Sequence, residues 1–176
     1  MKSLAFAVIG IMFVSIVSLS GNAFATEVKM TITSQVFKDS DIIPKKYACD
    51  GKNISPPLQF KNIPKNTKSL AIIMDDPDAP MGTFNHWIAW GISPKKHQIS
   101  EGEKGKISEG MNGLGQKGYF GPCPPTGTHR YYFKLYALDS NIDISEKSKK
   151  KELQVAIDKH VIQSANLMGK YTKTGK

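Results

Sequence analysis

Arginine is almost absent from this chain of 176 residues: of its 24 lysine and arginine residues, only Arg130 is an arginine. The common hydrolase motifs are also missing, since neither H-E-x-x-H nor G-x-S-x-G occurs and no nucleophile stands out. The chain has only two cysteines, Cys49 and Cys123, and neither has a second cysteine or a histidine at ligand spacing. These absences argue against a zinc finger and against the familiar hydrolase classes.

The first 25 residues have the pattern of a signal peptide. Lys2 supplies a positive charge, residues 4–17 form an apolar run too short to span a bilayer comfortably, and residues 23–25 form a small-x-small cleavage site. We therefore expect export to the periplasm or the extracellular medium. An uncleaved N-terminal anchor is the alternative. No cysteine directly follows the apolar run, so a lipid-anchored lipoprotein is not indicated.

Residues 26–176 have the length of one domain. The formal charge of the chain is +9, and removal of Lys2 leaves +8, which is compatible with anionic partners. The lysines are scattered, so simple solubility is the plainer explanation. Aromatic and basic residues are not interleaved as nucleic-acid binding requires, and we expect no nucleic-acid partner and at most peripheral membrane contact.

The two cysteines form an even count in a chain that we expect to be exported, which favours a disulfide between Cys49 and Cys123. Such a bond closes a long loop and is worth roughly 4 kcal/mol in the chain-entropy model. Two free thiols remain the alternative.

The apolar pattern predicts a mainly β domain with a C-terminal helix. Residues 28–32 alternate as in a half-buried strand, residues 70–74 and 87–90 are apolar throughout as in buried strands, and residues 131–138 are rich in aromatic and β-favouring types. Between about Glu146 and Met168, apolar residues recur at spacings of three and four, which predicts one amphipathic helix.

Residues 93–129 show no strong periodicity and contain eight of the fifteen glycines, which is typical of binding loops. The run "GLGQKG" (113–118) matches a dinucleotide-binding pattern by letter, but the residues 119–122 that follow cannot begin a helix. We interpret these glycines as turn residues.

Candidate binding side chains stand at strand ends, where a rigid backbone can aim them into one cleft. Each also has a structural explanation, because Asp-Pro is common in turns and a histidine beside a strand is often a core residue. The candidates are Asp76, His86, His129 and Tyr131.

Arg130 lies between His129 and Tyr131, and side chains alternate along a strand, so its guanidinium should point away from theirs. We expect it to pair with Asp78 as a structural strut, because a planar guanidinium can bind a carboxylate in a bidentate way that lysine cannot.

In order along the chain, "SPPL", "DPDAP", a histidine before an aromatic residue, and "GPCPPTGTHRY" resemble the phosphatidylethanolamine-binding proteins, in particular their bacterial Raf kinase inhibitor-like branch. The resemblance runs from about Thr31 to Tyr171. It implies a large central β-sheet, a smaller sheet packed on it and a flanking helix.

The resemblance also implies a small pocket for phosphate-like or head-group anions, and a binder or inhibitor in place of an enzyme. The implied lining is the four candidate side chains together with the backbone at Gly121 and Pro122. No cofactor or metal is implied. Two rivals are a metal-dependent or His/Asp hydrolase using Asp76, His86 and His129, and a protein-interaction module that does not use its pocket.

Overall fold

The computed structural model describes residues 28–103 and 105–173. The predicted signal segment lies outside the described residues. The strands are β1 (Thr31–Ser34), β2 (Leu58–Lys61), β3 (Ser69–Asp76), β4 (Phe84–Ile92), β5 (Gln98–Ile99), β6 (Ser108–Glu109), β7 (Thr128–Leu138) and β8 (Val161–Thr172); the helices are the 3₁₀ turn η1 (Lys45–Tyr47) and α1 (Lys150–Ile157).

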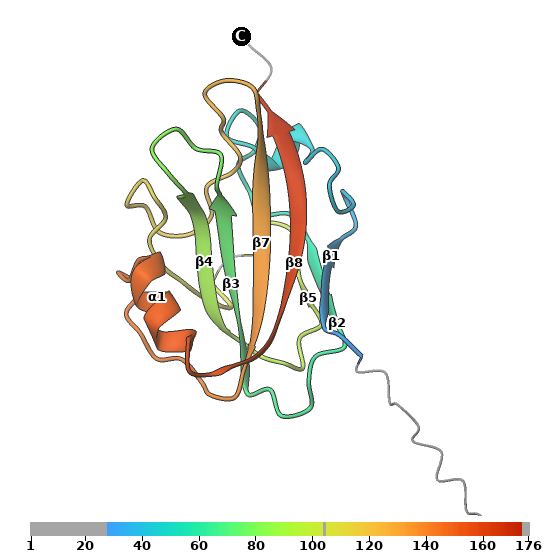
Figure 1. Ribbon diagram of the computed structural model, residues 1–176, viewed down its shortest axis with the longest axis vertical. Helices are drawn as coiled ribbons and strands as arrows, with labels where there is room; N and C mark the ends of the chain where they lie inside the picture. Colours follow the sequence, from blue (N-terminus) through green and yellow to red (C-terminus); the bar gives the residue numbers. More distant parts are fainter. Residues whose placement is uncertain (1–27, 104, 174–176) are drawn as a thin grey trace, which may run out of the picture.

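The strands form two antiparallel sheets. The large sheet has the order β6-β4-β3-β7-β8 and the small sheet has the order β1-β2-β5. In Figure 1 the helix α1 lies beside β4, whereas β1 and β2 lie on the opposite side of the large sheet. This arrangement confirms the expected mainly β fold with a larger and a smaller sheet.

Strand β3 is central, and all eight of its residues are buried. Leu70, Ile72 and Met74 join the core between the two sheets, while Ala71 and Ile73 join the core beneath α1. A strand covered on both faces needs apolar residues at every position, which explains why this run does not alternate.

The predicted helix over residues 146–168 is wrong in its second half. The helix α1 ends at Ile157, and β8 then pairs with β7 from Val161 opposite Leu138 to Thr172 opposite Thr128. Long-range pairing overrides the local apolar period here. None of the helices in residues 28–103 and 105–173 is long and apolar enough to cross a membrane.

Strand β1 begins at Thr31, three residues later than the alternation from Val28 suggests. The glycine-rich stretch after β4 contains only the two-residue strands β5 and β6, and the chain reaches the sheet again at β7. Much of this irregular stretch returns to one end of the large sheet, where β3 ends and β4 and β7 begin.

Candidate functional site

A β-bulge places His86 at that end of the sheet. Across from β3, Met74 is opposite Trp87 and Asp75 is opposite Asn85, so His86 is the extra residue on β4. Bulges re-aim a side chain, and they are frequent beside functional sites. The ring of His86 contacts the ring of Tyr131 on β7 edge-on, with 5.2 Å between centroids.

Strand β7 contributes His129 and Tyr131 from the same face, because residues two apart on a strand point the same way. Their neighbour Phe133 lies in the core between the two sheets. Asp76 is the last residue of β3. The structure thus brings Asp76, His86, His129 and Tyr131 together; the name "histidine cluster" is used below for these four residues.

Within the histidine cluster, His129 Nδ1 lies 2.7 Å from Asp76 Oδ2, and both side chains are buried. An ionised carboxylate only accepts hydrogen bonds, so Nδ1 carries the proton and donates. The other ring nitrogen, Nε2, is left for a ligand or water. The carboxylate therefore fixes the tautomer of His129.

His86 is oriented in the same way by a backbone group. Its Nδ1 lies 2.8 Å from the carbonyl oxygen of Phe120, which can only accept, and the Phe120 ring stacks on the imidazole at 5.6 Å. Burial lowers the pKa of His86, and this effect outweighs the Phe120 carbonyl and the Asp76 carboxylate, which act in the opposite direction. His86 is therefore neutral over a wider pH range than an exposed histidine.

Tyr131 is fully buried, and its hydroxyl lies near the Asp76 carboxylate and the Cys123 backbone without a hydrogen bond of good geometry to any described residue. Burial, followed by the charge of Asp76, raises the pKa of this hydroxyl. It is consequently a donor at all physiological pH values. A buried hydroxyl without a partner is uncommon in native proteins, and a bound water or ligand can satisfy it.

Access to the histidine cluster is narrow. His129 exposes 7% of its surface, whereas His86 and Asp76 each expose 3%. Tyr131 exposes none of its surface. Any ligand that reaches these nitrogens must therefore present a small group.

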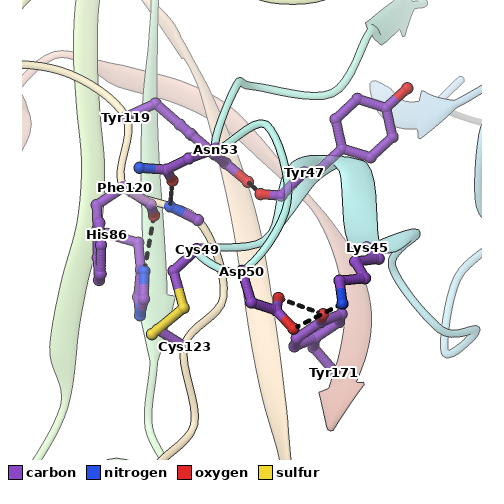
Figure 2. Close-up of a disulfide and its surroundings, with 11 residues drawn as sticks. Lys45, Tyr47, Cys49, Asp50, Asn53, His86, Tyr119, Phe120, Cys123 and Tyr171 are labelled. Carbon is purple, nitrogen blue, oxygen red and sulfur yellow. Dashed lines mark hydrogen bonds and ion pairs between the residues drawn. A yellow bond between two sulfur atoms is a disulfide. The ribbon is translucent and has the colours of Figure 1, made fainter. Parts of the chain in front are cut away.

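The wall of the site is held by the Cys49–Cys123 disulfide, which the structure contains with an S–S distance of 2.01 Å. Figure 2 shows this bond beside His86. Next to Cys123, the Gly121 N–H donates to Asn53 Oδ1 at 2.7 Å, and the Pro122 carbonyl accepts from the Cys49 N–H at 3.0 Å.

Only glycine fits at position 121, since a Cβ there would lie 2.2 Å from the carbonyl oxygen of Tyr47. The segment that carries Cys49 is also fixed from its other side, where the Tyr171 hydroxyl donates to Asp50 Oδ1 at 2.6 Å and Lys45 lies 3.6 Å from Asp50 Oδ2 (Figure 2). Tyr171 is directly opposite His129 in the sheet.

Arg130 points away from the histidine cluster and lies against Asp78. Its Nε donates to Asp78 Oδ2 at 2.9 Å, its Nη2 donates to Oδ1 at 2.6 Å, and its backbone N–H donates to Oδ2 at 2.9 Å. The guanidinium lowers the pKa of Asp78 to about 2. The pair connects the loop after β3 to the start of β7.

Sequence reasoning missed Asp75, whose side chain is buried on the α1 side of the sheet. Its Oδ2 accepts from Lys134 at 2.9 Å and from Lys150 at 2.7 Å. The adjacent "DD" pair at the end of an apolar run was the available signal, since two acids on a strand must face opposite sides. Nothing in the sequence indicated a role for Phe120, because it contacts His86 through its backbone carbonyl and by ring stacking.

Within residues 28–103 and 105–173, no group of three or more histidine, cysteine or acidic side chains is arranged to hold a metal ion. Both Nδ1 atoms of the histidine cluster are already engaged by protein acceptors.

A family model described as phosphatidylethanolamine-binding protein matches residues 33–172. The chain belongs to this family. Relatives include a "UPF0098 protein" of Pyrococcus horikoshii, 46% identical over 84% of this chain and 79% of the relative, and one of Chlamydia trachomatis, 44% identical over 82% and 99%.

Solved structures of family members match most of this chain. A Chlamydia trachomatis homologue of phosphatidylethanolamine-binding protein superposes with a TM-score of 0.80 at 44% identity, covering 83% of this chain and 99% of that chain. Escherichia coli YbcL, described as a new member of the mammalian family, gives 0.78 at 26% identity, covering 84% and 100%.

Proposed function

We propose that this protein binds a small oxyanion, such as phosphate or the phosphate of a lipid head group, at the histidine cluster. The observation that carries the proposal is the buried Tyr131 hydroxyl, which has no partner among the described residues and contacts the His86 ring edge-on. A ligand oxygen would satisfy this donor. The name of the family, phosphatidylethanolamine-binding protein, is in line with a phosphate-bearing ligand.

The two imidazoles determine how the anion is bound. With Nδ1 protonated on both rings, each neutral ring presents only a lone pair at Nε2, which accepts but cannot donate. A fully ionised oxyanion therefore requires at least one imidazolium, whereas a protonated phosphate can donate its own P–O–H to a neutral ring. Either way, binding requires a proton shared between ring and ligand.

Affinity should consequently rise as the pH falls. Burial lowers the pKa of His86, so this ring is neutral at neutral pH and gains a proton only in more acidic solution. Three or four hydrogen bonds at about 1.5–3 kcal/mol each, less the cost of association, correspond to micromolar to millimolar binding of a bare anion.

The proposal includes export of the protein and a modulating role toward another protein in place of catalysis. The signal-like first 25 residues support export. The sequence contains no nucleophile within a known hydrolase motif.

The direct test is calorimetric titration with inorganic phosphate at pH 6 of the wild type, His129→Gln and His160→Gln. His160 is a matched control, because its Nδ1 also bonds a carboxylate, Asp139 Oδ1 at 2.8 Å, but on the exposed surface. We expect at least about a tenfold loss of affinity in His129→Gln and none in His160→Gln. Equal affinities in the three proteins would refute the site.

A further inference from the structure

A cavity lies beside the histidine cluster and is lined by none of its four residues. It has a volume of about 910 Å³, at the upper end of the range for ligand sites, about 300–1,000 Å³. Its walls come from the loop between β3 and β4, from residues 111–115 and from the start of α1. The apolar wall residues are Ala79, Pro80, Met81, Phe84, Met111 and Val155.

Two of these wall residues are exposed without an evident packing role. Met81 is 100% exposed and Val155 is 69% exposed. A contiguous apolar surface around a cavity, unlike a single exposed side chain, is characteristic of a binding site. Methionine adapts its shape to flexible partners more readily than branched residues do.

The charged side chains that line this cavity are all positive. Lys149, Lys150 and Lys151 line it, and none of its described lining residues is acidic. Lys150 is held by Asp75, whereas Lys149 and Lys151 form no ion pair among the described residues. The N-terminus of α1 adds a partial positive charge, although the nearby Glu152 carboxylate already accepts from the Lys149 N–H at 2.9 Å.

Apart from its lysines, the cavity has only four polar side chains to offer a buried backbone, those of Thr83, Asn85, Asn112 and Gln154, and of these the buried Asn85 Oδ1 has no partner among the described residues. Asn112 uses its amide within its own loop, donating to the Gly118 carbonyl at 3.1 Å and accepting from the Leu114 N–H at 2.9 Å. A peptide would need partners for each buried N–H and C=O group, but an alkyl chain needs none.

From this combination we propose that the cavity binds a single-chain anionic amphiphile, with its alkyl chain against the apolar walls and its carboxylate at Lys149 and Lys151. Phe84 separates the two sites, since it lines the cavity and also packs edge-on against His86 at 4.7 Å. The cavity is thus adjacent to the histidine cluster, and its ligand is independent of the oxyanion proposed there.

Titration with dodecanoate below its micelle concentration tests the proposal, by calorimetry and by backbone amide NMR shifts. We expect saturable one-to-one binding with a dissociation constant of about 10–100 μM, shifts centred on Met81, Gly113 and Val155, and weaker binding of dodecanol. Saturating phosphate should leave the dodecanoate affinity unchanged.

Charge reversal gives the matched comparison. Lys149→Glu/Lys151→Glu should weaken dodecanoate binding by about tenfold or more, while Lys65→Glu/Lys159→Glu, with the same net change at exposed lysines outside the cavity, should not. Equal effects of the two double variants, or displacement of dodecanoate by phosphate, would overturn the proposal. Binding of an acidic peptide but not of dodecanoate would overturn it in favour of a peptide site.

Discussion

At the scale of single residues, the bonds made by two Nδ1 atoms define what the site offers a ligand. The Asp76 carboxylate accepts a hydrogen bond from Nδ1–H of His129, and the Phe120 carbonyl accepts one from Nδ1–H of His86. Both Nε2 atoms are left as acceptors until a proton arrives. The carboxylate beside a proposed anion site is therefore no contradiction, because it orients the imidazole of His129.

The sequence could identify these side chains but not their bonds. The motifs "DPDAP" and "THRY" pointed to Asp76 and His129, and alternation on a strand separated Arg130 from its neighbours. Nothing in the sequence indicated that Phe120 would bind His86 through its main chain, because backbone carbonyls are present at every position and only the fold selects one.

Arg130→Lys should lower the melting temperature and leave phosphate affinity unchanged. Lysine keeps the charge but cannot bond Asp78 through two nitrogens at once, as Nε and Nη2 do. Thermal melting and phosphate titration on the same preparation measure both effects. A loss of affinity without a change in melting would show that Arg130 belongs to the binding site instead.

The same pair has a predictable acid dependence. The pKa of Asp78 is lowered to about 2 in the folded protein, so its stabilisation is present above its ordinary pKa and is lost as the pH falls through about 2. The difference in melting temperature between the wild type and Arg130→Lys should therefore shrink between pH 4 and pH 2. A difference that stays constant over this range would contradict the assignment.

At the scale of elements, neither the bulge in β4 nor the length of β8 could be predicted from the local apolar pattern of the sequence. The bulge at His86 becomes apparent only from the register with β3. The segment after α1 carries an apolar spacing that also suits a helix, yet eleven residues of β7 pair with it. Partners far away in the chain decided both features.

The Asp75 carboxylate links α1 to the large sheet, because Lys150 from α1 and Lys134 from β7 both donate to it. Asp75→Asn removes the charge that both ammonium groups face in a buried position. We expect a loss of about 1–3 kcal/mol in the free energy of unfolding, moderated because the lysines can turn toward solvent.

Urea denaturation measures this loss. Asp158→Asn is the control, since it removes an exposed carboxylate at the other end of the same helix. Equal stabilities of the two variants would show that the Asp75 contacts contribute nothing to the attachment of α1.

At the scale of the whole molecule, one covalent bond and two sheets hold the site. The disulfide joins the segment after η1 to the segment before β7, and the bond lies beside His86 (Figure 2). The fold class and the cysteine pairing could both be predicted from the sequence, because the apolar pattern and the even cysteine count can be read without knowing the fold. The narrow access could not, since it depends on how loops pack.

Cys49→Ser/Cys123→Ser should lower the free energy of unfolding by about 2–4 kcal/mol and weaken phosphate binding. Without the disulfide, the long loop that it closes is free in the unfolded chain, which lowers the free energy of that state. The segment at Gly121 is then no longer tied covalently to the segment at Cys49. Urea denaturation and phosphate titration check the two effects. Unaltered stability and affinity in the double variant would show that the bond is irrelevant to both.

The most direct test of the whole account is the number of protons taken up when sulfate binds. Sulfate carries no proton near neutral pH, so it must be met by an imidazolium at the histidine cluster. Calorimetry in buffers of different ionisation enthalpy, from pH 5 to 9, should show uptake rising to about one proton per sulfate on the alkaline side, with affinity falling in step. Sulfate binding with no proton uptake and the same affinity throughout would contradict the account.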